Sequence, residues 1–365
     1  MAVQLVDTVR DDYLRRLTDD TGIFQHTKFG VPDRSKGYTT DDNARALIAA
    51  VLLYKERQDS AALDLIHTYL SFVHHAQHDR GNFRNFMDYN RNFLEERGSE
   101  DCQGRTVWAL GFAVSEPTVP DNLQNTCRYL IHEALPQLAE LRSPRAIGYA
   151  TVGLSMLLET PGALDYAFPY PHEEEGGGSF LSYDEIASLV ESWGQRLHDQ
   201  YHQYRRDDWH WFEDSMTYGN AMLPWALFKA AALTGRTDLH ATARESLAFL
   251  IRHTFAPEGY FRPIGSSGWF ERGKEKALYD EQPIEACETM LALLEAYHIT
   301  GSQQYKDCAS ACHDWYIGRN SLGVSLIDPQ TGACYDGIHP SGLNLNQGSE
   351  SIISYSIARS VIKGE

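Results

Sequence analysis

The sequence contains no run of about 18 apolar residues, the length at which a membrane-spanning helix becomes possible. Its first residues, "MAVQLVDTVRDDYLRRL", are amphipathic and lack the apolar core of a signal peptide. Strand-like alternation of apolar and polar residues is also scarce. These absences predict a mostly helical protein that does not enter a membrane and that works in the cytoplasm.

Basic residues are few: 32 Lys and Arg stand against 50 Asp and Glu, and the formal net charge is -18 at pH 7. The basic residues are scattered, whereas nucleic-acid binding depends on clustered Lys and Arg that neutralise phosphates. An acidic field also disfavours anionic membrane surfaces. We therefore expect neither a nucleic-acid nor a membrane partner.

Motifs for metals, nucleotides and covalent nucleophiles are missing as well. The six cysteines form no C-x-x-C pair, and Cys308 and Cys312 have no His or Cys partner at zinc spacing. The run from Gly176 to Ser179 lacks the Lys of a phosphate-binding loop and follows three Glu residues. No G-x-S-x-G pattern occurs. The sequence predicts reduced, mostly buried thiols, no metal and no cofactor.

Helical periodicity fills most of the 365 residues. Breaks between the periodic segments fall at helix-stopping residues such as Gly37, Gly235, Gly301 and the "EEEGGGS" run. We predict helices over residues 2–18, 41–57, 59–78, 103–115, 121–141, 144–159, 182–205, 217–234, 236–254, 281–299, 302–318 and 348–362.

Loop lengths predict how these helices are arranged. Short links such as "RQD", "TGRTD" and "TGSQQ" join helices into hairpins, and long loops rich in aromatic residues and glycine separate the hairpins. The second helix of each hairpin opens in a related way, from polar or small residues into a body rich in Ala, Gly, Ser and Leu. Small residues let neighbouring helices approach closely. The pattern indicates six inner and six outer helices closed into one barrel.

Six helical hairpins with long loops leading into the inner helices resemble the six-hairpin glycosidase superfamily, the (α/α)6 toroid. The strings "YTTDDNARAL", "WHWFEDSMTYGNAMLPWAL" and "YDEQPIEACETM" also carry the resemblance, which covers nearly the whole chain. It implies an all-α (α/α)6 barrel, here a single domain over residues 1–365, with a carbohydrate pocket where the inner helices begin. Because the superfamily also contains sugar epimerases and polysaccharide lyases, the resemblance leaves the reaction open.

Cleavage of a glycosidic bond needs an acid for the leaving oxygen and a carboxylate for water or the anomeric carbon. Asp41 and Asp42 stand at the start of an inner helix, where Thr40 is the expected N-cap and the helix dipole favours acids. Arg45, one turn later, would hold a carboxylate ionised. We predict Asp42 and, second to it, Asp41 as catalytic carboxylates, and Tyr38 and Arg45 as substrate-binding residues.

A second acidic pair, Glu213 and Asp214, lies beside several aromatic residues in "DDWHWFEDSMTYGN". Apolar neighbours raise the pKa of a carboxyl group, which suits a general acid, and sugar rings stack on aromatic side chains. Either acid is a candidate catalytic partner of Asp42. The substrate-binding residues predicted in this stretch are Trp209, Trp211, Tyr218 and Asn220.

A third pair, Asp280 and Glu281, precedes "QPIEACETM". Pro283 fits the first turn of a helix, which makes Gln282 the cap and leaves both acids in the loop, while Glu285 could close a capping box. Asp280 is a further candidate catalytic partner. The predicted substrate-binding residues here are Glu281 and, from the loop before it, Arg262 and Trp269.

The start of the last helix supplies a final acid, Glu350, and His339 lies just upstream. Each also fits a purely structural role: Glu350 as an acid in the first turn of a helix, and His339 as a histidine that only supports the fold. In a closed barrel they would join the same rim as the acidic pairs, so both are predicted to bind substrate.

The leading hypothesis is a glycoside hydrolase that acts on a short oligosaccharide with paired carboxylates. A sugar epimerase or isomerase would instead use His210 and His339 to move protons, and a lyase would use Arg262 and Tyr279. Outside the enzymes, a non-catalytic glycan-binding protein or a helical interaction array fits the same pattern. A small carbohydrate is the expected partner, and the sequence leaves monomer and dimer open.

Overall fold

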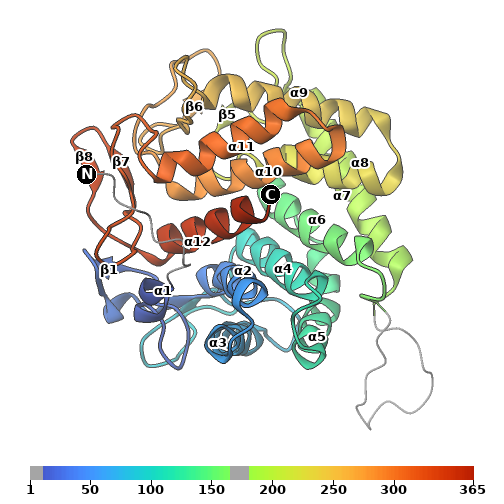
Figure 1. Cartoon of the computed structure of the whole chain (residues 1–365). Coiled ribbons are helices and arrows are strands. Elements are labelled where there is room, and N and C mark those ends of the chain that lie inside the picture. Colours follow the sequence, from blue (N-terminus) through green and yellow to red (C-terminus); the bar gives the residue numbers. More distant parts are fainter. Residues whose placement is uncertain (1–10, 165–180) are drawn as a thin grey trace.

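The chain alternates between an inner and an outer ring of helices (Figure 1). The computed structural model describes residues 11–164 and 181–365. The inner helices are α2 (Thr40–Arg57), α4 (Glu100–Ser115), α6 (Pro144–Glu159), α8 (Met222–Thr234), α10 (Pro283–Thr300) and α12 (Ser349–Gly364). The outer helices are α1 (Asp12–Arg16), α3 (Ser60–Ala76), α5 (Asp121–Leu138), α7 (Tyr183–Tyr204), α9 (Thr237–Thr254) and α11 (Gln303–Tyr316).

The inner ring is closed. Each inner helix contacts the next along the chain, and α12 returns to contact α2. Five outer helices each pack against the inner helix that precedes them, and α1 packs against α12. This arrangement confirms the predicted barrel of inner and outer helices.

Small residues allow the inner helices to lie unusually close, as their composition predicts. A Cβ atom on Gly111 of α4 would lie 2.1 Å from the carbonyl oxygen of Gly153 on α6, and one on Gly104 would lie 2.4 Å from that of Ala146. Contact between backbones at these points is possible only without side chains. The glycines therefore belong to the packing of the ring.

The loops that lead into the inner helices carry the few strands of the described residues. They form two-stranded antiparallel sheets: β1 (Thr27–Lys28) with β2 (Val31–Pro32), β3 (Tyr38–Thr39) with β4 (Phe86–Met87), β5 (Ser215–Met216) with β6 (Phe270–Glu271), and β7 (Gly337–His339) with β8 (Gly342–Asn344). The β3–β4 and β5–β6 pairs each join two different loops. They therefore tie the loops at one end of the barrel to one another.

Most helix boundaries lie within three residues of the prediction, and the differences at three helix starts have a clear cause or extent. The predicted helix 103–115 begins earlier, at Glu100, because Ser99 caps it. The predicted helix 217–234 begins at Met222, because Asn220 and the backbone of Thr217 form a turn instead. Of the predicted helix 2–18, the described part contains only α1, while residues 1–10 and the "EEEGGGS" run lie outside the described residues.

Two further findings bear on the sequence predictions. None of the helices in residues 11–164 and 181–365 combines the length and the apolar character needed to cross a membrane. All six cysteines are unpaired, and five of them are buried. The thiols are therefore mostly core residues, as predicted.

Candidate active site

A pocket with two lobes opens where the inner helices begin, and both lobes are lined by Asp41, Gln282 and Glu350. The first lobe, about 420 Å³, is here called the aromatic lobe. It is also lined by Asp101, Arg105, Tyr218, Ser266, Trp269 and Glu285. The second, about 320 Å³, is called the amide lobe, and its lining includes Gln25, Asp42, Asn85, Phe86, Asp280 and Asn344.

A larger hollow, about 510 Å³, lies on the outer surface beside α9 and α11. Ile251, Phe255 and Cys308 line it, and Asp307 is the one acid among its described lining residues. It therefore offers no pair of carboxylates. The inner-helix pocket, although its lobes are smaller, is the candidate active site.

The first turn of α2 presents two carboxylates to this pocket. Thr39, rather than the predicted Thr40, is the N-cap: its Oγ1 accepts from the Asp42 amide at 3.1 Å and donates to Asp42 Oδ2 at 2.7 Å. Asn85 Oδ1 accepts a hydrogen bond from the Asp41 amide at 3.1 Å. Both acids are thus fixed by their own helix start and by the neighbouring loop.

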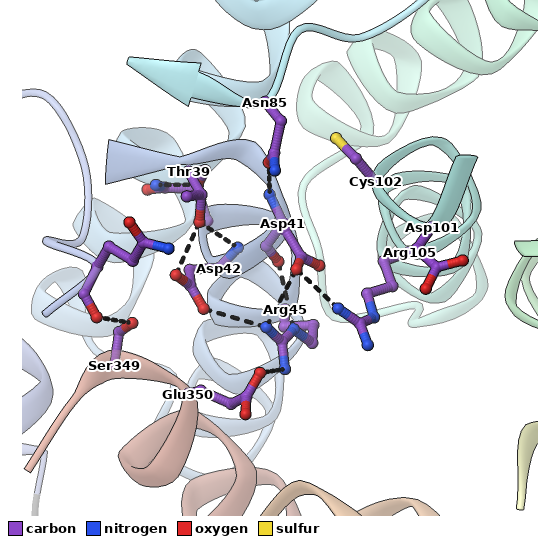
Figure 2. A network of polar contacts seen from close by, with 12 residues as sticks. Thr39, Asp41, Asp42, Arg45, Asn85, Asp101, Cys102, Arg105, Ser349 and Glu350 are labelled. Carbon is purple, nitrogen blue, oxygen red and sulfur yellow. Dashed lines mark hydrogen bonds and ion pairs between the residues drawn. The ribbon is translucent and has the colours of Figure 1, made fainter. Parts of the chain in front are cut away.

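Two arginines hold these carboxylates from different sides (Figure 2). Arg45 Nη2 lies 3.1 Å from Asp42 Oδ1 and 3.5 Å from Asp41 Oδ2, while its Nη1 lies 3.0 Å from Glu350 Oε2. Arg105, which reaches across from α4, places Nη1 2.7 Å from Asp41 Oδ2. One guanidinium therefore joins acids from α2 and α12, and a second one fixes Asp41.

The surroundings shift the pKa values of these two neighbouring acids in opposite directions. Burial raises the pKa of Asp41, but the guanidinium groups of Arg105 and Arg45 outweigh it and the pKa is lowered. Burial raises the pKa of Asp42 to about 6, although Arg45 acts in the opposite direction. Within the described residues Asp41 Oδ1 is buried and makes no hydrogen bond. Asp41 is thus an ionised carboxylate with a free oxygen.

The aromatic lobe contains a second acid whose pKa is shifted, Glu285 of α10. Its Oε1 accepts from the Gly219 amide at 2.6 Å, and its Oε2 makes a longer contact, 3.3 Å, with Asn220 Nδ2. Burial raises the pKa of Glu285 to about 6. The expected capping box is not formed, because Gln282 is the N-cap without a side-chain hydrogen bond. Glu285 instead faces the pocket.

Aromatic side chains form one wall of this lobe. Trp269 has a φ of 59°, in the left-handed region that bulky residues rarely adopt. Its ring centroid lies 6.4 Å from that of Tyr218, whose hydroxyl donates to Asp101 Oδ2 at 2.6 Å. Backbone strain of this kind occurs where the surroundings fix a side chain, and here Trp269 is held at the pocket.

The structure brings together seven of the residues predicted from sequence. His339, which was also predicted, is not among the described lining residues, but it contacts one of the seven: its Nε2 lies 3.2 Å from Asp280 Oδ1, without hydrogen-bond geometry. Whether these residues act on a substrate stays a prediction. The seven that line the pocket are Asp41, Asp42, Arg45, Tyr218, Trp269, Asp280 and Glu350.

The prediction that Trp209 and Trp211 bind sugar is wrong. Their exposed fractions are 3% and 0%. Trp209 packs edge-on against Phe249 and Phe270, and its Nε1 donates to the Glu213 carbonyl. The rings are core residues, so no face remains for a substrate.

Three other predicted binding residues are also turned into the protein. Glu281 is fully buried, accepting from Trp315 Nε1 at 2.8 Å and from Ser321 Oγ, and Tyr38 is buried with its hydroxyl donating to Asp19. Asn220 is buried too, and it contacts the pocket only through Glu285. The prediction that these three residues contact a substrate directly is therefore wrong.

None of the remaining candidates is among the described lining residues of either lobe. Glu213 pairs with Arg145 at 2.7 Å, and Asp214, which is largely exposed, pairs with Arg272 at 2.6 Å. Arg262 lies 3.5 Å from the buried Glu281. His210, the other histidine of the epimerase hypothesis, contacts Glu245 of α9 at 2.6 Å.

Sequence reasoning missed Arg105 and Glu285 as pocket residues, whereas Asp101 was expected at this rim as an acid at an inner-helix start. A signal for Arg105 existed: Arg45 follows Thr40, the first residue of α2, by five positions, and Arg105 follows Glu100, the first residue of α4, by the same five. Equivalent positions at two inner-helix starts point to the same rim. Glu285 carried no such signal, because an acid in a first turn also fits a capping box.

Comparisons with known proteins relate the fold, not the sequence, to others. No family model matches the chain, and no curated protein matches it. Among solved structures, a cellobiose 2-epimerase from Spirochaeta thermophila DSM 6192 superposes with a TM-score of 0.71 at 13% identity, covering 100% of this chain and 94% of that one. The chain is an (α/α)6 toroid.

Other solved structures with this fold are named for different activities. A D-mannose isomerase has a TM-score of 0.62 at 13% identity, with coverage of 97% of this chain and 95% of that one. The cellulase Cel9M of C. cellulolyticum has a TM-score of 0.56 at 12% identity, with coverage of 88% and 84%. At these identities the likeness establishes the fold alone, so the reaction must be argued from the pocket.

Proposed function

We propose that the protein hydrolyses a glycosidic bond in a short oligosaccharide, with Asp41 as the ionised carboxylate and Glu285 as the proton donor. One observation carries the proposal: two carboxyl groups line the same lobe, and their surroundings move their pKa values in opposite directions. Such separation is what divides acid from base in glycosidases.

Asp41 has the properties that the carboxylate role requires. Arg105 and Arg45 keep it ionised, and its Oδ1 is left free of hydrogen bonds. This carboxylate would take a proton from water or attack the anomeric carbon, depending on its distance from the acid when substrate is bound. Asp42, which the sequence favoured, has both oxygens engaged by Thr39 and Arg45 and serves better as a support.

Glu285 has the properties that the acid role requires. It is protonated below a pKa of about 6, and its Oε2 makes only the long contact with Asn220. That oxygen would give its proton to the leaving oxygen. Trp269 and Tyr218 would hold the sugar ring by contact with its apolar face.

The test compares leaving groups. Glu285→Gln should slow hydrolysis of an oligosaccharide by roughly 10²–10⁴-fold, the usual contribution of acid catalysis. It should slow a glycosyl fluoride far less, because fluoride leaves without protonation. Asp41→Asn should slow both substrates. Equal losses on both substrates in Glu285→Gln would exclude the acid role.

A second candidate is a sugar epimerase or isomerase, which the contact between His339 and Asp280 favours. A histidine beside a carboxylate is suited to remove a proton next to a carbonyl carbon. Several of the similar structures are named as epimerases or isomerases. The reaction would exchange a sugar C–H proton with solvent deuterium, which hydrolysis does not.

A further inference from the structure

The amide lobe is a second chamber of the pocket, and it adjoins the catalytic carboxylate Asp41 on the side away from Glu285, which lines the aromatic lobe alone. It adjoins the aromatic lobe through Asp41, Gln282 and Glu350, which line both. Its volume is about 320 Å³. A ligand that fills the aromatic lobe can therefore continue into this one without leaving the protein surface.

The amide lobe presents both donors and acceptors. Asn85 uses its Oδ1 for the Asp41 amide, and within the described residues its Nδ2 makes no hydrogen bond. Asn344 likewise uses Oδ1 for the Asn346 amide and leaves Nδ2 free in the part of the chain that is described. Asp280 also lines the lobe, and its Oδ1 is buried 3.2 Å from His339 Nε2 without a hydrogen bond. Sugar hydroxyls, which donate and accept at once, match such a mixture.

One apolar surface borders these polar groups. Phe86 lines the lobe, is 42% exposed, and lies on β4 directly after Asn85. The pairing of Thr39 with Phe86 fixes it against the strand that precedes α2. A half-exposed ring beside hydrogen-bonding groups is suited to the apolar face of a sugar.

The charges of the amide lobe select against anions. Asp42, Asp280, Asp336 and Glu350 line it, whereas Arg45 is the one guanidinium or ammonium group among its described lining residues. Arg45 already contacts Asp41, Asp42 and Glu350. A uronate or a phosphorylated sugar would therefore meet several carboxylates, while the guanidinium is already paired and the His26 imidazole is the one other basic group among the described lining residues.

We infer that the amide lobe is a subsite for a second, neutral sugar ring, with Phe86 as its stacking surface and Asp280 as its hydroxyl acceptor. The inference rests on the proposed function and narrows it: the preferred substrate is a neutral disaccharide or longer chain. A single sugar would fill only the aromatic lobe.

The experiment uses calorimetry and kinetics on the full chain. Cellobiose, maltose and β-1,4-mannobiose are compared with glucose and mannose, and at least one disaccharide should bind tenfold or more tightly than its monosaccharide. Phe86→Ala should remove that preference, and Phe86→Trp should restore it. Leu94→Ala, an exposed residue outside both lobes, should behave like the wild type. A glucuronosyl analogue of the preferred disaccharide should bind at least tenfold more weakly.

The outcomes separate this inference from the proposed function. With the matching glycosyl fluoride as second substrate, Phe86→Ala should lose at least tenfold more kcat/KM on the disaccharide than on the fluoride. Equal binding of disaccharides and monosaccharides, or equal losses on both substrates, would overturn the subsite even if hydrolysis occurs. A disaccharide preference that depends on Phe86, in a protein without hydrolysis, would keep the subsite and reject the hydrolase.

Discussion

Asp41 is the residue on which the candidate site most depends, because two guanidinium groups keep a partly buried carboxyl ionised. Removing Arg105 would leave that charge without its nearer partner. Breaking a buried ion pair by deleting one member costs about 3–5 kcal/mol. Because Arg45 still lies 3.5 Å from Asp41, we expect Arg105→Met to lower the free energy of unfolding by up to this amount, measured by urea denaturation.

The matched control is Arg91→Met, which breaks the exposed pair with Asp20. Water already screens that pair, so no measurable loss of stability is expected. Similar losses in both variants would show that burial of the Arg105–Asp41 pair has no special weight.

Glu288 of α10 gives a pH-dependent prediction. It is buried, its Oε1 accepts from the Tyr149 hydroxyl at 2.6 Å, and burial raises its pKa from 4.5 to about 8. Between pH 4.5 and 8 the unfolded chain releases this proton before the folded one, so its stabilising contribution is full below pH 4.5 and is lost as pH rises towards 8. Each pH unit costs up to about 1.4 kcal/mol.

Glu288→Gln has no proton to release. The difference in unfolding free energy between the variant and the wild type should therefore shift in favour of the variant as pH rises from 5 to 8. Urea denaturation at intervals of half a pH unit measures it. Parallel curves for the two proteins would mean that Glu288 ionises without cost in the folded state.

Glu285 predicts the pH profile of activity. With its pKa raised to about 6, kcat/KM should fall above pH 6 as the proton donor is lost. Asp42 has a pKa of about 6 as well, so the variants must separate the two. The fall near pH 6 should persist in Asp42→Asn and disappear from the residual activity of Glu285→Gln, and the reverse pattern would make Asp42 the acid.

Individual side chains were predictable where helix starts fixed them. Asp41, Asp42 and Glu350 each stand in a first turn, and a closed ring brings first turns together. Trp209 and Trp211 were misassigned because aromatic residues beside acids look the same in sequence whether they face a pocket or the core. Their packing partner Phe249 lies on an outer helix, a contact that local sequence does not contain.

Glycine residues determine how closely the helices of the inner ring pack against one another. Gly111 of α4 lies against Gly153 of α6, where an added Cβ would lie 2.1 Å from a backbone oxygen. Overpacking in a core costs about 1–3 kcal/mol and occasionally more. Gly111→Ala should therefore destabilise the protein by at least about 3 kcal/mol, since backbone rather than a flexible side chain must move.

Gly364, at the end of another inner helix, α12, provides the control substitution for Gly111→Ala. An added Cβ would meet nothing within 4 Å there, so Gly364→Ala should keep or slightly raise the thermal midpoint. If Gly111→Ala were as stable as Gly364→Ala, the inner helices would not depend on close contact.

Helix positions followed well from periodicity and stop residues, because a helix is specified locally. Pro283 and Gln282 illustrate this: the predicted first turn and cap are both observed. The start of α8 was missed because Asn220 closes a turn with Thr217 and supports Glu285, which belongs to another helix. Long-range partners of this kind override the local pattern.

At the scale of the molecule, ring closure creates the site. Asp41, Asp101, Glu285 and Glu350 are distant in sequence, yet they line one pocket because α2, α4, α10 and α12 begin at the same end of the barrel. The fold was predictable because it repeats a simple hairpin. The two lobes were not, since the long loops that shape them have no repeating pattern.

The central claim, hydrolysis by Asp41 and Glu285, is tested most directly by proton NMR of neutral oligosaccharides in deuterated water. The wild type should generate new reducing-end anomeric signals, and Asp41→Asn and Glu285→Gln should both lose them. The first anomer to appear would also give the stereochemistry. Intact glycosidic bonds, together with exchange of a sugar C–H proton for deuterium, would contradict the account and establish the epimerase chemistry of Asp280 and His339 instead.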